Sequence, residues 1–399
     1  MSAYYLARQP ILSANSETYG YELLFRSSNC NSFDPNIDGS IATCNVLLNA
    51  VVDIGMDKLV GNSLAFINLT EGFLASHELL NLLPPGRCVL EVLEDVDVTD
   101  EVFAGVQALV AQGHTVALDD FVDKEKFARL LPLARIIKYD ITQHTMEALQ
   151  AYRLEDEAAG RLSLVERVET HEEFEQLRGY GFQYFQGYFF ARPKIISGTK
   201  MPENRLALVQ LMAEINNPNS TMEDLVKLVE REVSLGLRTL KYINSPMSGL
   251  KTEVGSIQHA VVLLGRKLIR NWVTLLVMQQ MDDSPDEVVK LALARGRFCQ
   301  SVAESKSLDG SRYFLFGLLS LLDVFTGQAM EDALSSVAVS EDLHEELTSR
   351  SGEGGRMLEL IEFFETGDYK GTDDSSVLDM GRYHQSAVLW SEEMAGLLS

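Results

Sequence analysis

The sequence predicts an α/β barrel in the first half of the chain and an all-α domain in the second half. Up to about residue 190, short apolar runs rich in β-forming residues alternate with helical patterns, which is typical of repeated βα units around a parallel sheet. Eight such runs can be counted, the number of strands that closes a (β/α)8 barrel. Beyond residue 203 these runs stop, and only the helical period of apolar residues remains.

The strand candidates follow one another in order along the first half. They cover residues 4–11, 20–26, 64–70, 88–94, 115–121, 136–141, 162–168 and 184–190. Helical patterns lie between them, for example at residues 41–54 and 99–112, where apolar residues recur every three or four positions. We therefore expect a barrel domain over residues 1–192.

A linker is expected at residues 193–203, where Pro, Ser and Gly follow the last strand candidate. Residues 204–399 then form the helical domain. Ser220 and Glu223 have the spacing of a capping box at the start of one helix, and the glycines of residues 352–355 predict a flexible joint. Further helices are expected at residues 258–264, 267–279, 287–304, 313–325, 357–364 and 385–398.

Composition and charge exclude several classes of function. The 399 residues include 34 basic and 58 acidic side chains, which gives a formal net charge of −24. A surface this acidic repels phosphate backbones and anionic headgroups, so we expect neither nucleic acid nor a membrane surface as a partner. The four cysteines form no CxxC pair, and no apolar run reaches the roughly 20 residues of a membrane span. These features predict a cytoplasmic protein with reduced thiols.

One polar residue stands inside or at the end of nearly every strand candidate. Carboxyl ends of parallel barrel strands meet at one mouth, so these side chains should converge there. A buried carboxylate is tolerated only beside cations or donors, and a set of oxygen ligands suits Mg²⁺ or Mn²⁺. The set comprises Glu22, Asn68, Glu91, Asp119 with Asp120, Lys138, Glu166 and Gln186.

The chemistry that fits this set is phosphodiester hydrolysis. Four oxygen donors, from Glu22, Asn68, Glu91 and Asp119, suit one divalent ion, and Asp120 can reach a second. Two ions about 4 Å apart activate a water and clamp a phosphodiester. A single acid at a strand end is more simply a helix cap or a solvated rim group, but seven strands in phase favour a site.

At these residues the chain resembles the EAL-domain family, cyclic-di-GMP phosphodiesterases with a TIM-like barrel. The match covers about the first 190 residues, and the order, strand context and flanking residues of its motifs all agree. The motifs stand at residues 8–11 (RQPI), 22–26 (ELLFR), 66–69 (FINL), 91–94 (EVLE), 118–121 (LDDF), 137–140 (IKYD), 165–170 (VERVET) and 186–188 (QGY).

The resemblance implies a role for each matched residue. Lys138, Glu166 and Gln186 are implied in catalysis, with Lys138 and Gln186 orienting the water, and Arg26 is implied to bind a ligand phosphate. Glu94 and Glu169 are implied to support the ligands from behind, Glu94 by holding the loop after the paired aspartates. The implied cofactor of an active enzyme is Mg²⁺ or Mn²⁺. Its implied ligands are Glu22, Asn68, Glu91, Asp119, Asp120 and Glu166.

Three features depart from the family pattern. Phe121 leads into residues 122–125 (VDKE) instead of a run of glycine and small residues. The segment between Lys138 and Glu166 is short, and Arg167 replaces the glycine of the motif Glu-Gly-Val-Glu. These departures resemble a divergent branch of the family joined to a helical HDOD domain, in which catalysis is often lost.

The second half, from about residue 206, resembles that HDOD domain. Enzymatic relatives of HDOD domains use a His-Asp pair for metal, and Leu319-Ser320 stands at the corresponding place. The resemblance thus implies a scaffold for signalling proteins. Two hypotheses stay open: a cyclic-di-GMP signalling protein with weak or absent hydrolysis, and an active Mg²⁺- or Mn²⁺-dependent phosphodiesterase that produces the linear dinucleotide pGpG. A homodimer is a further expectation.

Overall fold

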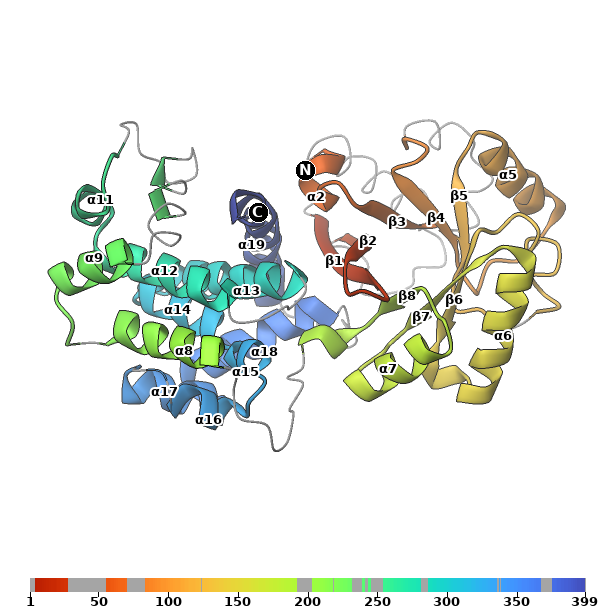
Figure 1. Cartoon of the computed structure of the whole chain (residues 1–399). Coiled ribbons are helices and arrows are strands. Elements are labelled where there is room, and N and C mark those ends of the chain that lie inside the picture. The colour runs from red at the N-terminus through yellow and green to blue at the C-terminus, as the bar shows by residue number, and fades with distance from the viewer. Residues whose placement is uncertain are drawn as a thin grey trace. The chain divides into compact units, whose positions relative to one another are not determined.

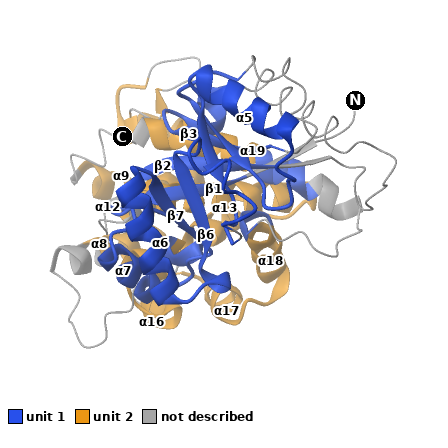
Figure 2. Cartoon of the chain, turned by 90° about the vertical axis from the view of Figure 1, so that its right-hand side faces the viewer, with its two compact units in different colours: residues 1–190, 364–385 blue, residues 191–363, 386–399 orange. Residues whose placement is uncertain are grey.

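The computed structural model describes most of the chain and divides it into two compact units (Figure 2). One unit comprises residues 1–190 and 364–385, and the other comprises residues 191–363 and 386–399. Thus residues 364–385 group with the barrel and not with the helices that precede them. The described residues are 4–27, 55–69, 83–122, 124–191, 203–217, 219–231, 239–240, 243–244, 254–280, 286–335, 337, 339–366 and 375–398.

Eight strands within the described residues close into the predicted barrel, in sequence order (Figure 1). The first strand is antiparallel to both of its neighbours, and the other neighbouring pairs are parallel. The strands are β1 (Tyr4–Ser13), β2 (Thr18–Ser27), β3 (Leu64–Leu69), β4 (Cys88–Val92), β5 (Thr115–Leu118), β6 (Ile136–Asp140), β7 (Leu162–Glu166) and β8 (Tyr184–Gln186).

Helices connect the strands, and side-chain caps define where several of them begin. Thr99 accepts a hydrogen bond from the backbone of Val102, and Thr170 forms a capping box with Glu173. The predicted helix at residues 41–54 lies outside the described residues. The helical elements here are α2 (Met56–Val60), α5 (Asp100–Ala111), α6 (Met146–Ala159), α7 (His171–Gly179) and the 3₁₀ turns η1 (Ile141–Gln143) and η2 (Tyr188–Ala191).

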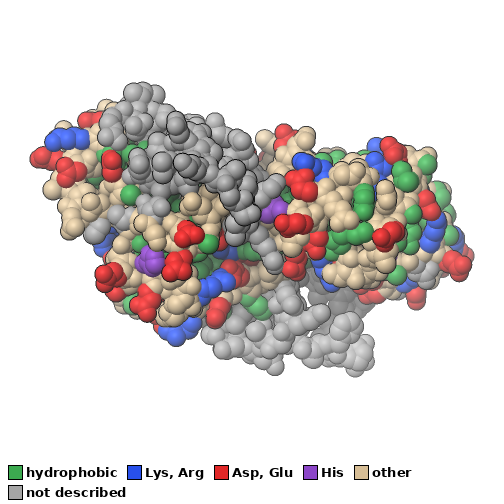
Figure 3. Space-filling model, turned by 60° about the horizontal axis from the view of Figure 1, so that its bottom comes forward, with side chains coloured by type: hydrophobic (Ala, Val, Ile, Leu, Met, Phe, Trp, Pro, Cys, Tyr) green, Lys and Arg blue, Asp and Glu red, His purple; other side chains and the backbone are tan. Residues whose placement is uncertain are grey.

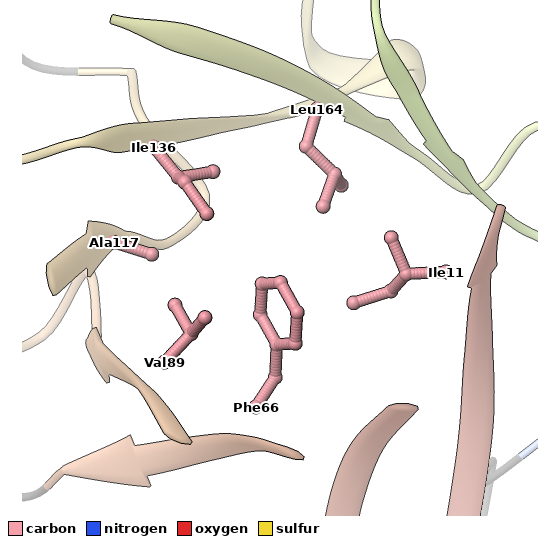
Figure 4. Packing of buried hydrophobic residues seen from close by; sticks show 6 residues of the cluster. All are labelled: Ile11, Phe66, Val89, Ala117, Ile136 and Leu164. Atoms are coloured by element: carbon pink, nitrogen blue, oxygen red, sulfur yellow. The ribbon is translucent and has the colours of Figure 1, made fainter. Parts of the chain in front are cut away.

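The barrel interior holds a fully buried apolar layer. Strands β1, β3, β4, β5, β6 and β7 each contribute one side chain to it, and these side chains point toward one another inside the barrel (Figure 4). Tyr184 of β8 packs against the same layer. The layer therefore forms a packed apolar floor inside the barrel. Its residues are Ile11, Phe66, Val89, Ala117, Ile136 and Leu164.

The second half of the chain is helical where it is described, as predicted. No helix in those ranges, or in the first half, combines the length and apolar character needed to cross a membrane. The helices are α8 (Glu203–Asn216), α9 (Met222–Arg231), α11 (Ile257–Leu264), α12 (Arg266–Gln280), α13 (Asp286–Ser305), α14 (Gly310–Leu319), α15 (Leu322–Thr326), α16 (Met330–Ser335), α17 (Glu341–Ser349), α18 (Gly352–Thr366) and α19 (Ser375–Leu398).

The capping box before α9 lies one residue later than predicted. The backbone N–H of Thr221 donates to Asp224 Oδ2 at 2.8 Å, and the backbone N–H of Asp224 donates to Thr221 Oγ1 at 3.2 Å. Ser220 Oγ donates to the Asn217 carbonyl at 2.9 Å. Because α9 begins at Met222, Thr221 is the residue whose hydroxyl can reach the third N–H of the helix.

The predicted flexible joint at residues 352–355 is wrong, because these residues form the first turn of α18. Their glycines permit close packing. A Cβ on Gly355 would lie 1.9 Å from the Arg350 carbonyl oxygen, and one on Gly354 would lie 2.6 Å from the Phe316 ring. Glycine is required here by the lack of space for a side chain.

Candidate functional site

A polar layer lies on the apolar floor of the barrel. In a strand, residues two apart point to the same face, so the residue two positions beyond each floor residue also points inward. On the parallel strands β3 to β7 this rule leads from the floor to Asn68, Glu91, Asp119, Lys138 and Glu166. Gly20 of β2 pairs with Ile11 of the floor, and two residues further stands Glu22. Gln186 follows Tyr184 in the same way.

Lys138 lies among the carboxylates of this layer. Its side chain is fully buried, and Nζ lies 2.7 Å from Glu91 Oε1, 2.7 Å from Asp119 Oδ1 and 2.6 Å from Glu166 Oε1. Glu22 Oε2 is 3.7 Å away. One ammonium group thus faces four carboxyl groups in a largely buried site.

Glu22 is held by two amide donors. Asn68 Nδ2 donates to Glu22 Oε1 at 2.9 Å, and Gln186 Nε2 donates to Glu22 Oε2 at 2.6 Å. Burial alone raises the pKa of the Glu22 carboxyl, but Lys138 and these two donors outweigh burial and leave the pKa below its usual value. Glu22 is therefore an ionised carboxylate with fixed orientation.

The other carboxylates around Lys138 have a different balance. Burial raises the pKa of Glu91 well above its usual value, and the carboxylates of Glu22 and Asp119 raise it further against the effect of Lys138. Burial and the same kind of repulsion raise the pKa of Glu166. For Lys138, burial lowers the pKa but the surrounding carboxylates raise it well above the ordinary lysine value. Glu91 and Glu166 thus hold protons more readily than ordinary carboxyl groups do.

Two residues at this end of the barrel have left-handed backbone conformations. Asp120 has φ of 41° and Arg167 has φ of 57°, a region that non-glycine residues seldom adopt. Arg167 forms an ion pair of 3.0 Å with the buried carboxylate of Asp140. Burial raises the pKa of Asp120 to about 6, Asp119, Glu94 and Asp140 raise it as well, and Arg167 opposes them. Such strained residues concentrate at functional sites.

The donor set fits a divalent cation. No described residue donates a hydrogen bond to the buried oxygens Asn68 Oδ1, Glu91 Oε2 and Asp120 Oδ1, and buried acceptors ordinarily have a partner. Carboxylate and amide oxygens are the ligands that Mg²⁺ and Mn²⁺ prefer. Across the described ranges, no three His, Cys, Asp or Glu side chains are arranged to hold an ion as they stand, and Lys138 Nζ lies between the carboxylates.

Comparison with known proteins places this chain in a family. The model of the HDOD domain matches residues 201–351, so an HDOD domain is present. The cyclic di-GMP phosphodiesterase CdgJ of Vibrio cholerae serotype O1 is 32% identical in an alignment 405 residues long, which covers 99% of this chain and 94% of CdgJ. The chain belongs to the CdgJ family.

Two further similarities accompany this one. The uncharacterised protein YuxH of Bacillus subtilis is 31% identical over 379 residues, which cover 92% of this chain and 91% of YuxH. A standalone EAL protein from Vibrio cholerae O395, solved in its c-di-GMP-bound form, is 23% identical with a TM-score of 0.40, over 48% of this chain and 92% of that protein.

In this member of the CdgJ family, eight of the predicted site residues share one end of the barrel; the other three are Arg26, Glu94 and Glu169. Arg26 belongs to β2, but its side chain is not among those described. Glu94 is exposed, and its backbone carbonyl accepts a hydrogen bond from Lys126 Nζ at 2.6 Å. Glu169 is exposed and its N–H donates to Glu173 Oε2 at 2.9 Å. The roles predicted for these three residues stay predictions.

Gln186 depends on the glycine that follows it. Gly187 has φ of 147°, and a Cβ there would lie 2.1 Å from the Val168 carbonyl oxygen. The backbone of Val168 donates to the Gln186 carbonyl at 3.1 Å and accepts from Phe189 at 3.2 Å. This close approach fixes the end of β8 and with it the position of the Gln186 side chain.

Sequence reasoning missed one member of the polar layer, Gln9. It lies two residues before Ile11 on β1 and directly opposite Glu22 on β2. Because β1 runs antiparallel to its neighbours, its inward residue at this level precedes the floor residue instead of following it. The signal was present in the RQPI motif, but the direction of the strand was needed to interpret it.

Proposed function

We propose that this chain is a cyclic-di-GMP signalling protein whose barrel opens the nucleotide to linear pGpG with Mg²⁺ or Mn²⁺. The observation that carries the proposal is the polar layer, in which four carboxylates, three amides and one lysine meet on an apolar floor. Two facts support the substrate: CdgJ is named a cyclic di-GMP phosphodiesterase, and the motifs around the layer resemble those of EAL domains.

Each residue of the layer has a task in this reaction. Glu22, Asn68, Glu91 and Asp119 would hold one divalent ion through their oxygens, and Asp120 and Glu166 would hold a second. When bound, such ions would polarise the phosphodiester and lower the pKa of the attacking water. Lys138 carries the positive charge that stabilises the negative charge of the transition state and orients the water. Gln186 orients Glu22, and Arg26 binds a phosphate of the nucleotide.

A second candidate is nucleotide binding with weak or absent hydrolysis. Two observations favour it: Arg167 stands in place of the family's glycine, in a strained conformation and paired with Asp140, and residues 121–125 lack the small residues of the family loop. In this case the HDOD domain passes the binding signal to protein partners. For both candidates, the net charge of −24 argues against nucleic acid as a partner. On the face drawn in Figure 3, Asp and Glu side chains are interspersed with Lys and Arg, without a continuous basic band among the described residues.

Chromatography of cyclic-di-GMP after incubation with the full chain and Mn²⁺ or Mg²⁺ tests the proposal. We expect pGpG from the wild type and none from Glu22→Gln, whereas Glu147→Gln, at an exposed position of α6, should match the wild type. Calorimetric titration should show that Asp119→Asn weakens Mn²⁺ binding.

The possible results separate the candidates. Nucleotide binding without product supports the second candidate. Product that survives Glu22→Gln shows that another site or a contaminant is responsible. Absence of both binding and product overturns both candidates.

A further inference from the structure

A chain of hydrogen bonds links the candidate ion site to the end of a helix far along the sequence. Glu22 Oε2 accepts from Gln186 Nε2 at 2.6 Å. The same nitrogen donates to Gln9 Oε1 at 2.9 Å, and Gln9 Nε2 donates to the backbone carbonyl of Thr366 at 2.7 Å. All four residues belong to the unit that contains the barrel. Thr366 follows the HDOD match, which ends at residue 351.

The chemistry of the two ends fixes the orientation of both amides. A backbone carbonyl can only accept, so Gln9 must present its nitrogen to Thr366 and its oxygen to Gln186. Gln186 then presents its nitrogen to Gln9, and the second N–H of that nitrogen reaches the Glu22 carboxylate. Reversing either amide would place two oxygens or two N–H groups against each other. The arrangement is consistent from one end to the other.

The series of hydrogen bonds stabilises a polar group at each of its ends, the Thr366 carbonyl and the Glu22 carboxylate. Thr366 is the last residue of α18, and the final four carbonyls of a helix have no partner within it. Gln9 supplies one such partner. At the other end, Glu22 is only 7% exposed and is ionised, so the N–H of Gln186 stabilises its charge.

A second contact holds the same segment to the barrel without involving these amides. Tyr188 donates its hydroxyl proton to Glu365 Oε2 at 2.7 Å. Glu365 and Thr366 are adjacent, so this is a separate attachment of the same segment. It differs from the attachment through Gln9, which continues to Glu22.

We propose that Gln9 is a positioning residue for the ion site, and that the C-terminal carbonyl of α18 aligns it. Through Gln186, Gln9 holds Glu22 in the orientation that an ion requires. The segment after the HDOD domain is then a structural part of the site, because it sets the orientation of Gln9. This inference rests on the ion site of the proposed function. Residues that hydrogen-bond directly to ligand side chains, as Gln186 does to Glu22, typically change metal affinity about 10- to 100-fold when they are substituted. Gln9 lies one hydrogen bond further out, so we expect an effect at the lower end of that range.

Calorimetric titration of the full chain with Mn²⁺ tests the inference with three variants. Gln9→Ala removes both bonds and should weaken Mn²⁺ binding about tenfold. Gln9→Glu keeps an oxygen for Gln186 but sets a carboxylate against the Thr366 carbonyl, and should also weaken binding. Tyr188→Phe removes the other attachment of the segment and should leave the affinity within about twofold of the wild type, since Gln186 and Glu22 keep their bonds.

A readout without metal accompanies the titration. In protein labelled with ¹⁵N-glutamine, the side-chain amide protons of Gln186 should exchange slowly with solvent in the wild type and in Tyr188→Phe. They should exchange faster in Gln9→Ala. A residue that merely stabilises the fold would not alter this one signal selectively.

The outcomes are distinct from those of the proposed function. Equal Mn²⁺ affinity of wild type and Gln9→Ala overturns the inference. So does an equal loss in Tyr188→Phe and Gln9→Ala, which would show that docking of the segment matters and the amides do not. A wild type that binds no Mn²⁺ refutes the ion site, and the exchange of the Gln186 amide then decides whether Gln9 orients it.

Discussion

Replacing Lys138 by methionine should destabilise the barrel in the absence of divalent ions. Lys138→Met removes the ammonium group but keeps the length and volume of the side chain. Glu91, Asp119 and Glu166, each within 2.7 Å of Nζ, then face one another without a cation. Removing one partner of a buried ion pair ordinarily costs about 3–5 kcal/mol, because it leaves a buried charge uncompensated.

The distances show why the loss should reach this size but not exceed it greatly. At an effective dielectric constant of 20, each contact at 2.7 Å contributes about 6 kcal/mol of attraction. Most of this is offset by the desolvation of the charges, several kcal/mol per ion. Glu91 and Glu166, whose pKa values burial already raises, can take up protons when Lys138 is absent. We therefore expect Lys138→Met to lower the free energy of unfolding by about 3 kcal/mol at pH 8.

The loss should shrink on acidification. A carboxyl group whose pKa is raised in the folded state stabilises that state at low pH, and this contribution disappears as the pH rises through the folded-state pKa. In Lys138→Met the raised pKa values of Glu91 and Glu166 favour their protonation as the pH falls, so the repulsion is relieved. The difference between variant and wild type should therefore be smaller at pH 5 than at pH 8.

Urea unfolding in chelator-treated buffer, with and without Mn²⁺, measures these effects. Mn²⁺ should stabilise Lys138→Met more than the wild type, because the ion no longer competes with an ammonium group; at 100 times its dissociation constant a ligand contributes about 2.7 kcal/mol. Lys290→Met is a matched control in the helical unit. It removes an ammonium group 2.9 and 3.1 Å from two carboxylates, and Mn²⁺ should not restore its stability.

Two results would refute this reasoning. If Lys138→Met were as stable as the wild type at pH 8 without ions, Lys138 would not be the counterion of the layer. If Mn²⁺ stabilised Lys138→Met and the wild type equally, the carboxylates would not share one cation position.

Three further predictions concern stability. Arg167→Ala and Arg167→Gly both lose the ion pair with Asp140, but glycine also relieves the strained φ of 57°. In urea unfolding, Arg167→Gly should therefore be more stable than Arg167→Ala by about 1 kcal/mol. Equal stabilities would show that the conformation carries no strain. Gly187→Ala should lower the free energy of unfolding by more than about 3 kcal/mol, because its Cβ would lie 2.1 Å from a backbone oxygen. Gly179→Ala, where a Cβ would meet open space, should be neutral or slightly stabilising. Similar melting temperatures of the two variants would contradict this prediction. Burial lowers the pKa of His384 to about 4 from its ordinary 6.5. Between these values the unfolded chain binds a proton that the folded chain does not, so the free energy of unfolding should fall as the pH drops from about 6.5 to 4. His384→Gln should weaken this pH dependence, and an unchanged pH profile would contradict the prediction.

The strand order and most of the polar layer were predictable because a strand alternates its faces. Once Ile136 is placed inside the barrel, Lys138 must point inward too, and the same rule applies on each parallel strand. Sequence alone could not show that Lys138 Nζ lies within hydrogen-bond distance of three carboxylates, since that depends on the diameter of the closed barrel and the rotamers chosen.

Other features depend on contacts between residues distant in the chain. Gln9 was missed because nothing in its own segment reveals that β1 runs antiparallel to its neighbours. The grouping of residues 364–385 with the barrel is a pairing of segments about 180 residues or more apart, which periodicity does not encode. The capping box was displaced because Ser220 and Thr221 are both good caps, and only the observed start of α9 distinguishes them.

The direction of β1 has a practical consequence for anyone who produces this protein. Along β1 the chain runs from the mouth toward the floor, since Gln9 precedes Ile11, so Tyr4 lies on the mouth side of both. A purification tag or fluorescent protein fused ahead of β1 would therefore emerge at the end of the barrel that carries the polar layer. Polyhistidine in that position would also chelate the Mn²⁺ being titrated. Binding and turnover are best measured on protein whose amino-terminal tag has been cleaved.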